Sequence, residues 1–338
     1  MIAIFPGQGS QFVGMSKDLF QEFPVVKRTF EEASDSIHIA IDKLCFDGPE
    51  DKLNLTENTQ PCLLTASIAS FRLAQTEFDF HPKLTAGHSL GEYSALVAAG
   101  AISFTDAVNW VKKRGQAMQV AVPVGQGAMA AILNVDETQM KMLCSQAIKN
   151  ALEKRAQLNP KDFLVDAWVQ PANFNAPGQI VIAGSKDAVT EAIELCKQDV
   201  FSKAKAILLP VSAPFHSKLM KPAREQMQLL FDNLTPEQKP KALQCSYLPN
   251  FTAKITSETE TIIPHLIEQI DHPVLWQQTM TEVLNQGYTS AIEFGPGKVL
   301  QGLNKRIAKN EKKSFDTHLL NNLDSLTKLE TILKGTLS

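Results

Sequence analysis

Short apolar segments alternate along the chain with longer segments whose apolar positions recur at helical spacing. Residues 2–5 and 84–87 are short runs that end at or just before glycine, which is typical of buried strands. Residues 61–74, 90–99 and 104–119 have the apolar content or the amphipathic spacing of helices. Strands that alternate with helices in this way indicate an α/β fold with a largely parallel sheet.

The expected helix boundaries rest on residues that satisfy free backbone groups. Thr59 is placed to cap the first helix, with Pro61 near its first position, and Thr105 or Asp106 stands at the start of the third. Gly100 is placed to end the second helix.

The middle of the chain has a different order of elements. Strands are predicted at residues 127–135, 168–170, 179–184 and 204–211, and helices at 137–151 and 186–198. Residues 173–178 are rich in turn formers and predict the connection between the second and third of these strands. The resulting order, β-α-β-β-α-β, is that of a ferredoxin-like unit. We therefore predict an inserted ferredoxin-like subdomain at residues 127–206, with residues 1–126 and 207–338 forming one larger domain.

Composition and charge narrow the class of protein. The 338 residues are 44% hydrophobic, which is enough for a large core and excludes a disordered chain. The net charge of −3 leaves no basic excess to neutralise phosphates, so a nucleic-acid partner is not expected. The five cysteines lack CxxC spacing, which predicts a reducing compartment without disulfides or a metal site.

The chain carries no pattern of secretion or membrane insertion. The first residues run directly into a strand that ends at Pro6 and Gly7, without the basic start of a signal peptide. The longest apolar stretches, such as residues 96–102, are far shorter than the roughly 20 residues that span a bilayer. These features predict a soluble, cytoplasmic protein with no membrane partner.

The strongest local signal for chemistry is the G-H-S-L-G sequence at residues 87–91. It is a G-x-S-x-G pattern between a predicted strand and a predicted helix, which is the context that a nucleophilic serine requires. Ser89 would lie on a sharp turn, with the backbone N–H groups of the helix start near a developing oxyanion. The alternative is a tight strand-to-helix turn that happens to contain a serine.

A nucleophilic serine needs a base, and His216 is the candidate among seven histidines. It follows the predicted strand that ends at residue 211, and loops beyond strands are where α/β sheets present functional groups. His88 is adjacent to Ser89, but neighbouring residues on such a turn point apart. The alternative for His216 is a solvated or capping residue.

Arg114 is informative because of its position on a helix face. It lies three residues after Val111 and four after Trp110, on the apolar stripe of the predicted helix 104–119. A buried guanidinium needs an anion, and its planar fork fits a carboxylate. The anion is either a substrate carboxylate or an Asp or Glu in a structural ion pair.

The G-Q-G-S-Q sequence at residues 7–11 follows the first strand. Its glycines allow the backbone to approach a ligand, and its N–H groups are candidates for half of an oxyanion hole. It lacks the third glycine of a dinucleotide fingerprint and the Gly-Lys-Ser/Thr of a phosphate-binding loop. By itself it predicts only a tight turn.

Several motifs in the same order resemble the malonyl-CoA:acyl carrier protein transacylase family, the acyltransferases of fatty acid and polyketide synthesis. The matching segments are F-P-G-Q-G-S-Q at 5–11, T-Q-P at 59–61, G-H-S-L-G-E-Y at 87–93, R-G at 114–115, G-A-M-A-A at 127–131, N-F-N-A-P-G-Q at 173–179, F-H at 215–216 and F-G-P-G-K-V-L at 294–300. The resemblance runs from residue 2 to about residue 308. It implies an α/β-hydrolase-like large domain with an inserted ferredoxin-like small one.

The resemblance also implies roles for individual residues. Ser89 is the nucleophile, His216 its base, and the backbone N–H groups of Gln8 and Leu90 form the oxyanion hole. Arg114 holds the malonyl carboxylate.

Further residues follow from the same resemblance. The main-chain carbonyl of Gln269 orients the histidine in place of a carboxylate. Gln60, Met118, Asn173 and Phe215 belong to the substrate pocket, where the bulk of Phe215 disfavours a methyl branch on the malonyl group.

Two segments depart from the family pattern. Residues 147–166 are longer than usual, and residues 248–251, L-P-N-F, match only loosely the usual strand end that contains Asn. We expect neither segment to touch the chemistry.

The predicted activity is that of an acyl-carrier-protein S-malonyltransferase. Malonyl passes from malonyl-CoA to Ser89 and then to the phosphopantetheine thiol of an acyl carrier protein, with no cofactor bound in this chain. A hydrolase that edits carrier-bound chains and a non-catalytic module that docks carrier proteins are the alternatives. Lys218, Lys221 and residues 305–313 are basic and are candidates to meet an acidic carrier, or are simply solvated. We expect a monomer; the pathway and the carrier stay open.

Overall fold

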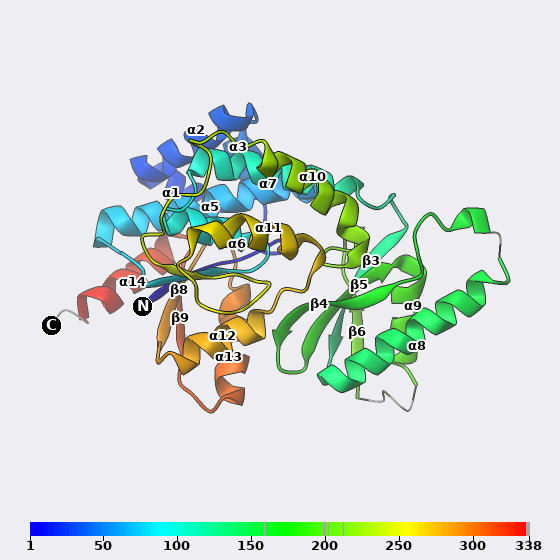
Figure 1. The fold of residues 1–338 in the computed structure, drawn as a ribbon. Coiled ribbons are helices and arrows are strands. Elements are labelled where there is room, and N and C mark those ends of the chain that lie inside the picture. Colours follow the sequence, from blue (N-terminus) through cyan, green and yellow to red (C-terminus); the bar gives the residue numbers. More distant parts are fainter. Residues whose placement is uncertain (159, 199–200, 202, 212, 336–338) are drawn as a thin grey trace.

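The computed structural model describes residues 1–158, 160–198, 201, 203–211 and 213–335, and it contains two separate sheets (Figure 1). One sheet is at the centre of a large lobe that also holds both chain ends, and the other forms a smaller lobe with α8 and α9. In the described part of the chain, no helix combines the length and the apolar character needed to cross a bilayer.

The sheet of the large lobe is five-stranded, entirely parallel and ordered β7-β2-β1-β8-β9. Its strands are β1 (Ile2–Phe5), β2 (Leu84–Gly87), β7 (Ser246–Leu248), β8 (Ser290–Phe294) and β9 (Asp316–Leu320). The central strand β1 and its neighbour β2 are buried at every residue, as expected for parallel strands covered on both faces. The parallel α/β sheet predicted from the sequence is therefore confirmed.

Helices cover both faces of this sheet, and alternate residues of β1 show the two layers. Ala3 and Phe5 belong to the core beneath α5 (Thr56–Phe78), α6 (Gly91–Ala98) and α7 (Phe104–Val120). Ile2 and Ile4 belong to a second core with α12 (Trp276–Asn285) and α13 (Val299–Asn310). The remaining helices of this lobe are α1 (Lys17–Glu22), α2 (Pro24–Ile37), α3 (Ile41–Asp47), α4 (Glu50–Leu53), α10 (Lys221–Asp232), α11 (Ile262–Asp271) and α14 (Leu323–Gly335).

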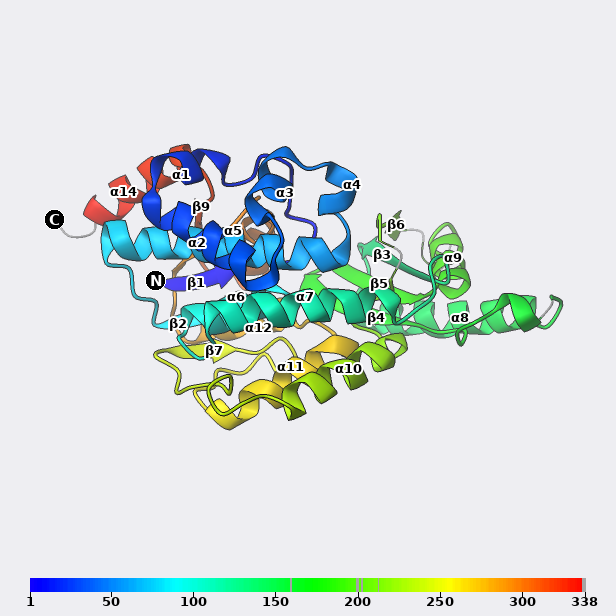
Figure 2. The ribbon, with the colours of Figure 1, turned by 90° about the horizontal axis from the view of Figure 1, so that it is seen from above.

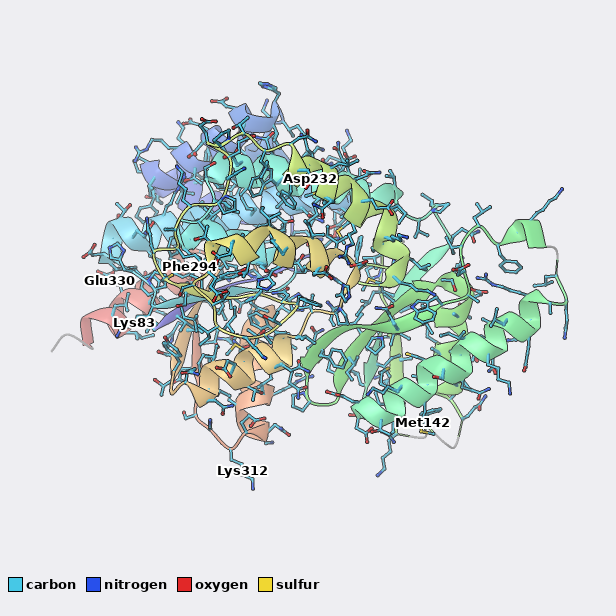
Figure 3. The ribbon with its side chains drawn as sticks, in the orientation of Figure 1. Lys83, Met142, Asp232, Phe294, Lys312 and Glu330 are labelled. Atoms are coloured by element: carbon cyan, nitrogen blue, oxygen red, sulfur yellow. The ribbon has the colours of Figure 1, made fainter. Side chains whose placement is uncertain are left out.

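The view from above shows α5 and α7 running side by side over the sheet, with α10 and α11 along one flank (Figure 2). Phe294 at the end of β8 packs against Phe5 and Phe71, and it lies inside the large lobe in Figure 3. This aromatic cluster holds α5 against the ends of β1 and β8.

The small lobe is a four-stranded antiparallel sheet covered on one face by two helices. Its elements are β3 (Gly127–Leu133), α8 (Glu137–Arg155), β4 (Val169–Ala176), β5 (Gln179–Ser185), α9 (Lys186–Leu195) and β6 (Lys205–Leu208). The order β4-β5-β3-β6 is that of a ferredoxin-like unit, which confirms this part of the predicted fold. The lobe has its own apolar core, and Met142 on the outer side of α8 is 55% exposed (Figure 3). The division into domains at 126/127 and 206/207 stays a prediction.

Three local predictions were wrong. The first long helix begins at Thr56, so Thr59 and Pro61 lie inside it, and the Thr59 hydroxyl donates to the carbonyl of Leu53 at 2.6 Å. The third helix is capped by Ser103, whose hydroxyl accepts the N–H of Asp106 at 3.1 Å.

The third error concerns the segment expected to be a turn. Strand β4 continues through Asn173 and ends at Ala176, so only Pro177 and Gly178 connect it to β5. Its outer side is paired with the large lobe, because Phe174 N–H donates to the carbonyl of Val274 at 2.9 Å. These long-range hydrogen bonds favour a strand where the local composition favours a turn.

Candidate active site

Ser89 lies at the tip of a sharp turn between β2 and α6, in the left-handed region with φ of 52°. The turn requires both flanking glycines. A Cβ at Gly87 would lie 1.9 Å from the carbonyl oxygen of Gly91, and a Cβ at Gly91 would lie 2.2 Å from that of Phe5. Close packing of the turn against itself and against β1 thus holds the half-buried serine in a strained position.

The Ser89 hydroxyl lies 2.7 Å from Nε2 of His216. The other ring nitrogen, Nδ1, lies 2.7 Å from the main-chain carbonyl oxygen of Gln269. A carbonyl only accepts, so the Nδ1 proton points to Gln269 and Nε2 keeps its lone pair for the serine. Burial, together with the nearby Arg114, lowers the pKa of His216 to about 3, which keeps the ring neutral and able to accept a proton.

Arg114 reaches the same hydroxyl from α7 and is 1% exposed. Its Nη2 donates to Ser89 Oγ at 3.2 Å and to Gln269 Oε1 at 2.6 Å, and its Nη1 donates to Gln60 Oε1 at 2.9 Å. All three partners are neutral, and Nε has no hydrogen-bond partner in the described part of the chain. Burial lowers the pKa of Arg114, although Tyr93 and Glu92 oppose this effect.

The structure bears on whether Arg114 forms a structural ion pair. Among the residues that the structure describes, no carboxylate lies within salt-bridge distance of its guanidinium. The nearest link to an acid runs through the amide of Gln269, which donates to Glu92 at 2.7 Å. Arg114 therefore keeps hydrogen-bonding capacity for an anion that enters from outside.

These side chains line a cavity of about 190 Å³ between the two lobes. Nine of the ten candidate site residues line it: Gln8, Gln60, Ser89, Leu90, Arg114, Met118, Asn173, Phe215 and His216. Gln269 lies behind this surface and reaches it through His216 and Arg114. The volume is below the roughly 300 Å³ of sites for drug-sized ligands, which suits a group of a few heavy atoms.

The cavity has a polar end and an apolar wall. Ser89, His216 and Arg114 form the polar end. The wall comes largely from the small lobe and its connection, through Met129, Val181, Leu209, Val211 and Phe215. Within the described chain, the backbone N–H groups of Gln8 and Leu90 donate to no other residue, so both are free to bind an oxyanion.

Comparison with known proteins agrees with this geometry. The acyl transferase domain family matches residues 3–324. The chain is 44% identical over 309 residues to a malonyl CoA-acyl carrier protein transacylase of Bacillus subtilis, covering 91% of this chain and 90% of the relative. The corresponding Escherichia coli protein is 42% identical over 304 residues, covering 90% and 91%.

Solved structures give the same result. An acyl carrier protein S-malonyltransferase from Vibrio cholerae superposes with a TM-score of 0.84 at 41% identity, covering 97% of this chain and 99% of that one. A malonyl-transacylase solved in complex with its type II PKS acyl-carrier protein gives 0.86 at 40% identity, covering 96% and 97%. The chain belongs to the malonyl-CoA:acyl carrier protein transacylase family.

Asn250 contacts the backbone of Ser89, contrary to our expectation that its segment does not touch the candidate site. Its Oδ1 accepts the backbone N–H of Ser89 at 2.6 Å, and its Nδ2 donates to the carbonyl of Gly87 at 2.6 Å. The side chain thus holds both sides of the strained turn. The sequence signal was an asparagine two residues after a strand, but only the fold shows that this strand, β7, pairs with β2 and ends beside Ser89.

Glu92 is the other residue that the sequence reasoning missed. It is fully buried one helical turn after Ser89, and its Oε2 accepts from Asn250 N–H at 3.0 Å and from Gln269 Nε2 at 2.7 Å. Gln269 Nε2 also donates to the Ser89 carbonyl at 2.9 Å. Burial raises the pKa of Glu92 to about 7. Glu92 binds Asn250 and Gln269, and the side chains of these two residues bind the N–H and the carbonyl of Ser89.

One group of potential metal ligands lies behind the cavity. Glu268, Asp271 and His272 bring ligand atoms within 4.8 Å of one another. Arg224 donates to both carboxylates, and its Nη1 lies 3.0 Å from Asp271 Oδ1. Since the Arg224 guanidinium already binds both carboxylates, we assign no metal to this cluster.

Proposed function

We propose that this chain transfers a malonyl group from malonyl-CoA to the phosphopantetheine thiol of an acyl carrier protein, through a malonyl-serine intermediate. One observation carries the proposal. The Ser89 hydroxyl lies within hydrogen-bonding distance of both a neutral histidine and a buried guanidinium that has no acidic partner. A serine with a base is an acyl acceptor, and the unpaired cation selects an acyl group that carries a carboxylate.

The first half-reaction uses the geometry at the polar end of the cavity. His216 Nε2 takes the proton of Ser89 as Oγ bonds to the thioester carbonyl carbon. The N–H groups of Gln8 and Leu90 stabilise the negative charge on the oxygen. When the carbon–sulfur bond breaks, the CoA sulfur takes the proton from His216, and malonyl stays on Ser89.

The second half-reaction reverses these steps with another thiol. The carrier's pantetheine thiol gives its proton to His216 and attacks the malonyl-serine carbonyl, and Ser89 recovers a proton as its ester bond breaks. The pantetheine arm belongs to the partner, so the reaction needs no cofactor held by this chain. A cytoplasmic location and a monomeric state stay predictions, and both fatty acid and polyketide synthesis remain open as pathways.

Arg114 and the apolar wall account for the choice of acyl group. The malonyl carboxylate supplies the missing anionic partner of Arg114, whereas an acetyl group offers the guanidinium no anion. Phe215 is 9% exposed at the cavity wall, where its bulk crowds a methyl branch on the malonyl group. Such a steric contact discriminates by about 1–3 kcal/mol.

A transfer assay separates this function from its alternatives. The protein is incubated with radiolabelled malonyl-CoA, the label on the protein is counted, and a holo acyl carrier protein is then added. Label that forms on Ser89 and passes to the carrier supports transfer. Free malonate as the main product indicates a hydrolase, and no label on the protein contradicts both enzymatic readings.

Two variants make the assay specific. Ser89→Ala removes the acceptor and abolishes protein-bound label. Ser257→Ala is the matched control, because the exposed Ser257 hydroxyl lies 2.8 Å from that of Ser246, away from the cavity, and it leaves the labelling unchanged. Label that persists in Ser89→Ala places the acyl group elsewhere and overturns the proposed intermediate.

A further inference from the structure

The main chain of His216 is strained and depends on its surroundings. Its φ of 60° lies in the left-handed region, which costs a non-glycine residue about 1–2 kcal/mol. Such a conformation persists only where neighbouring groups determine it. Gln269 fixes the ring through Nδ1, but the ring position also depends on what holds the backbone of residue 216.

The small lobe supplies that contact through Gln170 on β4. Its Nε2 donates to the carbonyl oxygen of His216 at 3.3 Å, and its Oε1 accepts the backbone N–H of Lys218 at 3.2 Å. One side-chain amide therefore binds a carbonyl and an N–H two residues apart, as a neighbouring strand would. Among the residues that the structure describes, no other donor reaches the His216 carbonyl.

The orientation of this amide is fixed by its neighbours. Trp168 Nε1 donates to Gln170 Oε1 at 2.7 Å, and the backbone N–H of Lys218 donates to the same oxygen. The other end of the amide, Nε2, therefore faces the His216 carbonyl. The Lys218 ammonium lies 3.4 Å from the centre of the Trp168 ring, which holds the indole in place. Trp168 of the small lobe and Lys218 of the large lobe thus orient the Gln170 amide towards the His216 carbonyl.

We propose that Gln170 is a positioning residue, through which the inserted subdomain holds His216 in the geometry that accepts the Ser89 proton. The proposal rests on the proposed role of His216 as base. It explains why a base carried by the large lobe has its backbone bound by the small one. A displacement of about 1 Å at a catalytic group can lower a rate by up to about a hundredfold.

Two substitutions separate the two halves of the amide. Gln170→Ala removes both hydrogen bonds. Gln170→Glu keeps the acceptor for Trp168 and Lys218 but faces the His216 carbonyl with an oxygen. We expect both variants to slow the reaction of Ser89 on the order of tenfold, because both lose the bond to His216. Gln146→Ala is the control, since this exposed glutamine on α8 bonds only to Asn150, and it has no effect.

The readout is the rate at which methanesulfonyl fluoride modifies Ser89, followed by mass spectrometry. This small probe needs the serine and its base but neither malonyl-CoA nor a carrier, so it tests Gln170 even where malonyl transfer fails. The final extent of modification counts competent sites. A positioning role lowers the rate and leaves this extent complete, whereas misfolding lowers the extent.

A double-substitution cycle decides whether Gln170 acts through His216. In a His216→Ala background, Gln170→Ala should cause no further loss, because the residue that it positions is gone. Equal losses with and without His216 overturn the proposal. Full-rate modification of Gln170→Glu, or modification of the unaltered chain that does not depend on His216, overturns it as well.

Discussion

Replacing Arg114 by alanine should invert the preference between malonyl and acetyl groups. In the structure the guanidinium is 1% exposed, and three neutral oxygens take three of its five N–H donors. On the proposed function, a malonyl carboxylate would bind the remaining donors, whereas an acetyl group has no carboxylate to do so. The substitution therefore removes an interaction that only the malonyl group makes.

The magnitude follows from the burial of the site. A hydrogen bond to a charged group contributes about 1.5–3 kcal/mol, and a charge left without its partner in a buried site costs about 3–5 kcal/mol. Each 1.4 kcal/mol is about tenfold in rate, so kcat/KM for malonyl-CoA should fall by roughly a hundredfold to a thousandfold. The value for acetyl-CoA should stay level or rise, because a buried cation no longer faces the methyl group.

The assay measures the formation of acyl-enzyme from labelled malonyl-CoA and acetyl-CoA side by side. Arg72→Ala is the matched control, since Arg72 pairs with Glu32 at 2.5 Å away from the cavity, and it should leave the ratio of the two rates unchanged. An Arg114→Ala enzyme that loses both activities equally would show that Arg114 supports the fold or Ser89 rather than the carboxylate. That result would refute the reasoning.

Two further predictions concern His216 and Asn250. The pKa of His216 is lowered from 6.5 to about 3, so the neutral ring's contribution to the free energy of unfolding is complete above pH 6.5. This contribution is lost as the pH falls towards 3, by about 1.4 kcal/mol per pH unit. Between pH 7.5 and 5, the denaturant midpoint should therefore fall more for the unaltered chain than for His216→Ala. Asn250→Ala leaves the Ser89 N–H and the Gly87 carbonyl unpaired, at about 1–3 kcal/mol each, so it should lower Tm by several degrees and slow the acylation of Ser89, and an unchanged Tm would contradict this view of the turn.

The parts of the site that could be predicted from the sequence are those set by local pattern. Gly87 and Gly91 lie so close to neighbouring backbone that neither position has room for a side chain. The sequence shows this requirement as a G-x-S-x-G pattern between a strand and a helix. The burial of Arg114 could be predicted because this residue lies on the apolar stripe of a helix, and the structure confirms that it is buried.

The rest of the site depends on which strand ends meet. Asn250 and Glu92 are 158 residues apart in sequence, and their hydrogen bond exists only because β7 pairs with β2. Strand β4 was expected to end near residue 170 because its later residues are turn formers, and it continues because Val274 of the large lobe pairs with it. Local propensity could not report either contact, since both are made by distant chain.

The neutral surroundings of Arg114 leave this buried cation without an anionic hydrogen-bond partner among the described residues. A direct carboxylate partner would satisfy the guanidinium and remove the penalty that distinguishes an acyl group with a carboxylate from one without. Among the described residues, Glu92 is joined to Arg114 by hydrogen bonds only through the amide of Gln269, which accepts from the guanidinium with Oε1 and donates to Glu92 with Nε2. The same residue binds the His216 ring through its main-chain carbonyl. Gln269 therefore links His216, the turn at Ser89 and Arg114, while it adds no charge beside the guanidinium.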